Sequence, residues 1–405
     1  MADFSGKESG DSGNGSGSGS RRSADMASVE LALFSRLFIL SPDSPTIAII
    51  GAGLTGLLAA HGLHKNGFKA VVFDKDPGPD VRERDWTMLM HWALPMLTEL
   101  LPEDILADLP QAFCNPHLDF NEDAESLPCY NALTGTSCSG ALSRMSKTED
   151  GSAVVLEFEG GDKFEAERVL GADGVSSKAR ELLAGEERAR VQRSGFLFAT
   201  GITRYGDADK TEAIMKLHPV AALMMGTSSV GAVGTMAVDD PQDKSTWTTF
   251  WVKIWRGESV HLRDQEALNY IERETSALSG VFQSAIDWTP EGSRVFIDEM
   301  KYWVPVPWDN LGGRATLAGD AAHPMLIYRG QGLQHCITDV RNYVDSLVRV
   351  RGGADAAKVM QELDDEVVAR GAKAVQQSLQ EAEKSLDLET IRKMLMVTQG
   401  HGRSA

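Results

Sequence analysis

The run Gly51-Ala-Gly53-Leu-Thr-Gly56 has the spacing of a glycine-rich turn that binds a pyrophosphate. In such a turn Gly51 permits the tight bend, Gly53 lets a phosphate approach the backbone, and Gly56 lets a helix pack closely against a strand. The phosphates lie at the helix N-terminus, where free N–H groups and the helix dipole favour negative charge. Alone, this pattern is weak evidence, because a structural turn can contain the same glycines.

The residues on both sides of the turn predict the elements that would position it. The apolar, β-branched run Thr46–Ile50 predicts a buried strand before it, and the helical stretch after it ends near Asn66-Gly67. Ala70–Phe73 predicts a second buried strand, which completes a βαβ unit with parallel strands. Asp74 ends that strand, where a carboxylate accepts hydrogen bonds from ribose hydroxyls. The unit therefore predicts a dinucleotide site, for NAD or for FAD.

Two further motifs end apolar strands much later in the chain. The first is Val169-Leu-Gly171-Ala-Asp173-Gly174-Val-Ser-Ser-Lys-Ala-Arg180, an apolar strand that leads into a loop and a helix. The second is Ala315-Thr-Leu-Ala-Gly319-Asp320, which follows much later in the chain. Asp320 comes where its strand ends, so we expect its side chain to reach a ribityl hydroxyl.

The run Tyr328-Arg-Gly330-Gln331-Gly332 opens a helix that we expect to extend to about Val350. Gly330 and Gly332 leave room for a flat ring beside the backbone. The N-terminus of the helix would stabilise the anion of a reduced flavin. Apolar residues at helical spacing anchor this helix: Leu333, Ile337, Val340, Val344 and Leu347.

In this order the three motifs resemble the FAD-dependent monooxygenases of the aromatic-hydroxylase (group A) superfamily. The segments Arg82–Pro95 and Trp303–Asn310 look like those of a subgroup common in fungal secondary metabolism. The resemblance extends from Thr46 through the C-terminal helices. It implies an FAD site at Gly51, Gly53, Gly56, Asp74, Asp173, Gly174, Gly319, Asp320, Gly330, Gln331 and Gly332.

The family implies an α/β fold, with a doubly wound Rossmann-like FAD-binding domain, an inserted, mostly antiparallel β-sheet substrate domain and C-terminal helices. We predict a poorly ordered extension at 1–41, the two parts of the FAD domain at 42–190 and 301–350, the substrate domain at 191–300 and a helical tail at 351–405.

The chemistry that the family implies is reduction of FAD by NADPH or NADH, followed by addition of O₂ to give a C4a-hydroperoxyflavin. The distal oxygen then hydroxylates or epoxidises a small aromatic or secondary-metabolite substrate. No side chain is assigned a catalytic role, because the flavin carries the difficult step.

The chain departs from the family between Gly135 and Leu142. Relatives continue here with a helix and strands whose arginine contacts the cofactor, whereas this chain runs almost at once into the predicted hairpin Leu142–Gly151. A helix and a strand are missing near 136–141. Their loss leaves apolar surface uncovered and removes cofactor contacts, so we expect weakened FAD binding and poor solubility.

For several other candidate site residues, a structural role explains the residue as well as a functional role does, or better. His91 and Trp92, expected on a helix after Asp74, either line the cavity or belong to the core. Arg82 and Arg84 either contact the cofactor or form a solvated turn. We expect a structural hydrogen bond from His323, and little effect of Gln334-His335 where many relatives have Asn. The acidic residues of the C-terminal helices predict a solvated face.

Three alternative functions share this fold. A flavin halogenase should show a Trp-x-Trp-x-Ile-Pro segment and a lysine after the first motif, and neither is present in the sequence. A flavin dehydrogenase or reductase stays open, as does an inactive, truncated paralogue.

Composition limits the partners. The net charge of −18 argues against nucleic acid or anionic lipid. Four scattered cysteines without a CxxC pair predict reduced thiols and no metal site. We expect a cytoplasmic enzyme without an integral membrane segment, and the sequence leaves the oligomeric state open.

Overall fold

A computed structural model describes residues 46–76, 87–89, 92–112, 129–131, 141–225, 228–274, 278–385, 388–391 and 393. The predicted extension 1–41, the predicted candidates Arg82, Arg84 and His91, and most of the short connection between Gly135 and Leu142 lie outside the described residues.

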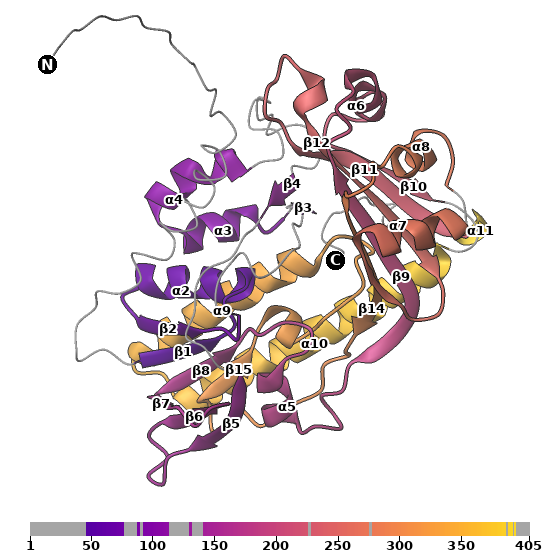
Figure 1. The fold of residues 1–405 in the computed structure, drawn as a ribbon. Coiled ribbons are helices and arrows are strands. Elements are labelled where there is room, and N and C mark those ends of the chain that lie inside the picture. The colour runs from indigo at the N-terminus through magenta and orange to yellow at the C-terminus, as the bar shows by residue number, and fades with distance from the viewer. Residues whose placement is uncertain are drawn as a thin grey trace, which may run out of the picture.

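A parallel sheet with the strand order β15-β8-β1-β2 forms one layer of the molecule (Figure 1). Its strands are β1 (Thr46–Ile50), β2 (Lys69–Phe73), β8 (Arg168–Gly171) and β15 (Ala315–Leu317). Except for their first residues, β1 and β8 are buried throughout, as parallel strands covered on both faces are. Strands from opposite ends of the chain lie side by side here, which confirms a doubly wound layer built from discontinuous segments.

Long helices cover this sheet. α2 (Leu54–Lys65) connects β1 to β2 and packs against α9 (Gly332–Arg351), while α10 (Ala356–Lys384) lies along α9 and reaches β15. α2 ends where the sequence predicted, with Asn66 as its C-cap and Gly67 at a φ of 74°. The shorter helices are α3 (Leu94–Leu100), α4 (Glu103–Asp108), η2 (Leu109–Ala112), α5 (Lys178–Ala184), η4 (Gly319–Ala321) and α11 (Leu388–Ile391).

An antiparallel sheet with the order β10-β11-β12-β9-β14-β13 forms a second layer (Figure 1). Its strands are β9 (Gln192–Thr203), β10 (Ala221–Met225), β11 (Ser229–Ala237), β12 (Thr248–Arg256), β13 (His261–Arg263) and β14 (Arg294–Tyr302). The predicted antiparallel sheet is therefore confirmed.

Three helices that the sequence analysis missed lie against this sheet, together with the turn η3 (Lys244–Thr246). They are α6 (Ala208–Met215), α7 (Asp264–Arg273) and α8 (Val281–Asp287). Their apolar residues share a core with Trp251 and Trp255, which lie on one face of β12. Each helix is short, so its apolar residues repeat over only two or three turns. The neighbouring β-like segments therefore dominate the hydrophobic pattern of this region.

Two smaller sheets complete the described structure. β5 (Leu142–Lys147), β6 (Val154–Phe158) and β7 (Lys163–Ala166) form an antiparallel meander, which confirms the predicted hairpin. β3 (Thr87–Leu89) pairs with β4 (Cys129–Asn131). The helix that we predicted around Trp92 is wrong for this residue, which lies in a turn. Pro95 sets the start of α3 two residues later, because proline fits only the first turn of a helix.

The strand β2 lies at one edge of the parallel sheet. Among the described residues it pairs with β1 alone, and its first four residues are only half-buried. Phe73, at its buried end, packs against Phe158 and Phe164 with ring centroids 4.9 and 4.8 Å away. No helix of the described chain is long and apolar enough to cross a membrane.

A buried carboxyl group joins the C-terminal helix to the end of the parallel sheet. Asp364 on α10 accepts hydrogen bonds from the Thr316 hydroxyl on β15 and from Asn310 Nδ2 at 2.8 Å. Asp364 is 4% exposed, and burial raises the pKa of its carboxyl group to about 7.

This raised pKa predicts a pH-dependent stability. The folded-state pKa lies above that of the unfolded chain, so the stabilisation by Asp364 is complete below the unfolded pKa and is lost as the pH rises through about 7. Between pH 5 and 8 the loss is about 2–3 kcal/mol. In Asp364→Asn, thermal unfolding should lose this part of the pH dependence. Parallel curves of melting temperature against pH for both proteins would contradict the assignment.

Candidate functional site

The turn after β1 packs directly against the end of β8. Gly51 has a φ of 107°, and a Cβ atom there would lie 2.8 Å from the Cα atom of Asp173. A Cβ atom on Gly56 would overlap the Gly51 carbonyl oxygen. The first and second motifs therefore meet backbone to backbone, and only glycine permits both approaches. Gly53 is the N-cap of α2 and makes no side-chain cap, so the first N–H groups of the helix stay available to an anion.

Asp74 holds this turn in place. Its carboxylate accepts hydrogen bonds from the backbone N–H groups of Ala52 at 2.6 Å and Asp76 at 2.9 Å. The side chain comes from the end of β2, beside β1, because β1 and β2 run parallel. A hydrogen bond to a ribose hydroxyl stays a prediction, and the structure adds a second role, which is to fix the turn.

Asp173 binds the first N–H groups of the next helix, α5, whose N-cap is Ser177. Its carboxylate accepts hydrogen bonds from Ser177 Oγ at 2.5 Å, Lys178 N at 2.7 Å and Ala179 N at 3.1 Å, and Gly174 follows with a φ of 79°. These bonds stabilise the loop between β8 and α5.

Arg180 connects the second motif to the third, a role that the sequence analysis did not assign. The side chain is 2% exposed and stacks on Trp303, with Cζ 5.1 Å from the ring centroid. Its guanidinium donates to the carbonyl oxygens of Val175 at 2.6 Å, Ala321 at 3.2 Å and Asp320 at 3.3 Å. The only sequence signal was its position at the end of the second motif.

The third motif packs on the first. A Cβ atom on Gly319, whose φ is 61°, would overlap the Thr55 hydroxyl on α2, and Thr55 Oγ1 lies 2.9 Å from Cys336 Sγ on α9. Asp320 follows at the end of β15. The pKa of its carboxyl group is raised by desolvation, although the residue remains exposed to solvent. A carboxylate that is both crowded and accessible occupies a recessed position.

The segment before α9 has a strained backbone, and it leads to an open position at Gly332. Arg329 has a φ of 83°, which is uncommon for a residue with a side chain, and Gly330 has a φ of 58°. Gln331 is the N-cap of α9 and makes no side-chain cap. A Cβ atom on Gly332 would meet nothing within 4 Å. The start of α9 therefore has no side-chain cap and has room beside the backbone at Gly332, as the prediction of a flat ring requires.

The remaining candidates make structural contacts next to the site. His323 Nε2 lies 2.7 Å from Asp339 Oδ2, which is the structural hydrogen bond that we expected. Trp92 is half-buried and packs edge-on against His335, with ring centroids 5.7 Å apart. Gln334 is fully buried, and its Oε1 accepts from Ala93 N at 3.1 Å, so this departure from the family pattern also ties α9 to the segment before α3.

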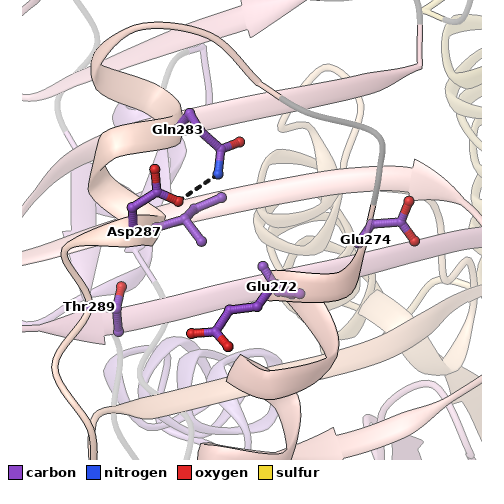
Figure 2. A pocket seen from close by; sticks show the side chains of 7 residues that line it. Glu272, Glu274, Gln283, Asp287 and Thr289 are labelled. Carbon is purple, nitrogen blue, oxygen red and sulfur yellow. Dashed lines mark hydrogen bonds between the residues drawn. The ribbon is translucent and has the colours of Figure 1, made fainter.

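A pocket of about 260 Å³ lies elsewhere, between α7 and α8. Figure 2 shows Glu272, Glu274 and Asp287 around it, with Gln283 bonded to Asp287 at 2.8 Å. These helices cover the sheet face that carries Trp251 and Trp255, whereas the segment with Leu326 and Tyr328 contacts the opposite face. Within the described residues no group of side chains could hold a metal ion, which includes these carboxylates.

Fold and site together define a dinucleotide-binding oxidoreductase. Three glycine motifs meet at the carboxyl ends of parallel strands, where open α/β sheets bind nucleotides. Two uncapped helix N-termini, the recessed Asp320 and the open space at Gly332 fit a cofactor with a pyrophosphate, a polyol chain and a flat ring. The residues present therefore fit FAD.

Comparison with known proteins gives the family. Residues 106–378 match the FAD binding domain, and residues 49–85 match the NAD(P)-binding Rossmann-like domain. The chain belongs to the FAD-dependent monooxygenases of the aromatic-hydroxylase superfamily, and it is an oxidoreductase with FAD as cofactor.

One relative is the FAD-dependent monooxygenase phnB of Penicillium herquei, which is 31% identical over 89% of this chain and 95% of its own length. CtdE, solved in complex with FAD and a substrate, matches 86% of this chain and 91% of its own with a TM-score of 0.66 and 18% identity. A salicylate hydroxylase substrate complex matches 90% and 97%, with a TM-score of 0.65 and 16% identity. These two structures support the fold.

The alignment with phnB contains positions at which this chain has no residue. It spans 393 positions but takes in only 89% of the 405 residues of this chain. The relative therefore has residues within the aligned region that have no counterpart here.

Two glycines of the site should respond differently to alanine. Gly56→Ala overlaps the Gly51 carbonyl group, so we expect a loss of about 1–3 kcal/mol in the free energy of unfolding. Gly332→Ala enters open space on a helix, so stability should stay within about 1 kcal/mol while the methyl group occupies the room for the ring. Denaturant unfolding and titration with FAD measure both effects. Unchanged FAD affinity of Gly332→Ala would remove Gly332 from the site.

Proposed function

We propose that this chain is an NAD(P)H- and O₂-dependent monooxygenase that hydroxylates or epoxidises a small aromatic or secondary-metabolite substrate. One observation carries the proposal. The motifs that contain Gly51, Asp173 and Gly319 meet at the carboxyl ends of the parallel strands. The family membership supports it, because curated relatives at similar length are FAD-dependent monooxygenases.

In this proposal the three motifs divide the cofactor among them. The N-terminus of α2, with Gly51, Gly53 and Gly56, holds the pyrophosphate, and Asp74 holds the adenosine ribose. Asp173 and Gly174 support the loop beside it.

The third motif serves the ribityl chain and the ring. Asp320 holds a ribityl hydroxyl, while Gly330, Gln331 and Gly332 border the ring. Bound flavin supplies the oxygen-transfer chemistry. The protein binds and orients both reactants and excludes water.

The substrate side of the proposal rests on one face of the antiparallel sheet. Phe198 and Ile254 pair across β9 and β12 and pack with Leu326 and Tyr328 from the segment before α9, so this face is turned toward the third motif. Residues in register on the same face continue away from that contact, and nearly all are apolar: Val230, Ala232, Gly234, Phe250, Val252, Thr200 and Ile202. Thr200 Oγ1 donates to the Trp251 carbonyl oxygen, so it offers little polarity.

This face favours an uncharged, flat organic substrate. In the described part of the sheet, charged side chains of this face lie around the apolar residues. Arg256 follows Ile254 at the end of β12 and lies over the Phe196 ring. On the β13 and β14 side, Arg294 and Arg263 lie over Phe296, and Arg263 bonds Asp298 at 3.1 Å. Burying a charged substrate against apolar residues would cost free energy without compensation, whereas an aromatic ring gains from stacking on phenylalanine. We propose that residues 191–300 form the substrate domain, 42–190 and 301–350 the FAD domain, and 351–405 a helical tail.

Oxygen use distinguishes this function from a flavin dehydrogenase or reductase. With FAD and a panel of uncharged phenolic and polycyclic compounds, a substrate should accelerate NAD(P)H oxidation together with an equal uptake of O₂. Mass spectrometry should show a product heavier by one oxygen atom. Oxidation of NAD(P)H without O₂ uptake would instead identify a dehydrogenase or reductase, and no oxidation would identify an inactive paralogue.

The second candidate, an inactive truncated paralogue, is favoured by the edge of the parallel sheet. β2 is an edge strand whose first four residues are only half-buried, whereas the other edge strand, β15, is buried throughout, and phnB has aligned residues that this chain lacks. We propose that a helix and a strand missing near 136–141 would have covered this edge and contacted the cofactor.

This deletion predicts a low flavin content. The purified chain should contain much less than one FAD per protein, because contacts to the cofactor are lost while the glycine motifs remain. Grafting the corresponding segment of phnB between Gly135 and Leu142 should raise the flavin absorbance per protein and the solubility. An insert of equal length made of glycine and serine is the control. Near-stoichiometric FAD in the unmodified chain would overturn the proposal.

A further inference from the structure

One face of the C-terminal helix α10 holds the whole segment between the third motif and α9. Leu326 N donates to Ser378 Oγ at 3.2 Å, and Arg329 Nη1 donates to Gln377 Oε1 at 2.8 Å. Just past the end of α10, Ser385 Oγ donates to Tyr328 OH at 3.2 Å. Three residues of the strained segment before Gly330 are therefore fixed by one helix.

The same helix reaches Gly319 of the third motif through a buried carboxylate. Asp339 on α9 accepts from Gly319 N and His323 Nε2, each at 2.7 Å, through Oδ2. Its other oxygen, Oδ1, accepts from Arg370 Nη2 of α10 at 2.5 Å. Arg370 is also bonded to Glu366, one turn earlier on α10, at 2.7 Å. A continuous chain of charged groups thus runs from α10 to the backbone of Gly319.

This network is buried and tightly packed. Asp339 and His323 are each 1% exposed, and a Cβ atom on Gly371 would lie 2.9 Å from the Cβ atom of His323. Burial alone would raise the pKa of Asp339, but His323 and Arg370 hold it well below its usual range. Burial, together with His323 and Arg370, lowers the pKa of His335 to about 3, so its neutral Nδ1 can accept from Arg370 Nη1, 3.0 Å away.

A second ion pair joins the same two helices, but it is exposed to solvent and does not contact the third motif. Arg349 on α9 donates to Glu362 on α10 at 2.9 Å, with about half of each side chain in solvent. This pair joins the helices but touches nothing in the third motif, and exposed pairs of this kind contribute little to stability. A variant of this pair therefore tests whether contact between α9 and α10 alone affects the third motif.

We propose that Arg370 is a positioning residue of the FAD site, which acts through Asp339 to fix the Gly319-Asp320 turn. This rests on the proposed role of that turn in FAD binding. The charged chain ends on a backbone N–H of the turn itself, and further hydrogen bonds from α10 and its C-cap reach Leu326, Tyr328 and Arg329. The C-terminal helix is therefore part of the cofactor site although none of its residues is proposed to touch FAD.

FAD titration of the apoprotein, followed by quenching of flavin fluorescence, tests this directly. Arg370→Met should raise the Kd for FAD at least tenfold, because Gly319 N then bonds a carboxylate that is no longer held. Arg370→Lys keeps the charge but not the fork that reaches Asp339, Glu366 and His335, so it should recover part of the affinity. Arg349→Met, the matched control, should change the Kd less than twofold.

A double variant separates positioning from stability. Arg370→Met alone leaves a buried, unpaired carboxylate and should lower the melting temperature, whereas Asp339→Asn with Arg370→Met removes both charges and should restore much of it. If Arg370 positions the turn, FAD affinity stays low in the double variant. If FAD affinity returns with the melting temperature, or never changes in Arg370→Met, the inference is overturned. Absence of FAD binding by the unmodified chain would instead count against the proposed cofactor site.

Discussion

The structure depends on close backbone approach at the carboxyl ends of four parallel strands. Gly51 lies against the end of β8, Gly56 against the Gly51 carbonyl group, and Gly319 against Thr55 on α2. A side chain at any of these positions would push two elements apart, so the contacts that bring the motifs together are also those that close the core. This shared requirement explains why segments far apart in sequence form one site.

The charges around the site are satisfied within the protein. Asp74 and Asp173 accept backbone N–H groups of the loops that they fix, and Asp339 accepts from Gly319 and Arg370. Asp320 differs, because its carboxylate is crowded yet open to solvent. Most carboxylates of the motifs therefore build the shape of the site, whereas Asp320 remains exposed to solvent.

The sequence predicted the parallel layer well because its signals are local. β1, α2, β2 and α9 each have an apolar period or a glycine boundary, and the structure has them within about two residues of the predicted bounds. The convergence of the three motifs followed from the family resemblance. Arg180, Asp339 and Arg370 were missed, since their roles depend on contacts across 140, 20 and 31 positions that no local period records. The acidic residues of the C-terminal helices were predicted to form a solvated face. This prediction is wrong for Asp364 and Glu381, because both side chains are buried.

The edge strand β2 connects stability to function in this chain. An open sheet has two edge strands, which among the described strands are β15 and β2. β15 is buried throughout, whereas Val71 and Val72 of β2 are only half-buried. Asp74 follows directly on β2 and fixes the turn after β1 through Ala52. Because Asp74 is the next residue after β2, a displacement of β2 also displaces the turn that Asp74 fixes. The third motif is held separately, by α10. The two halves of the cofactor site thus differ in their support: the half that would bind the ring is braced by a buried ionic network, and the half that would bind the adenosine is fixed by the least protected strand of the sheet.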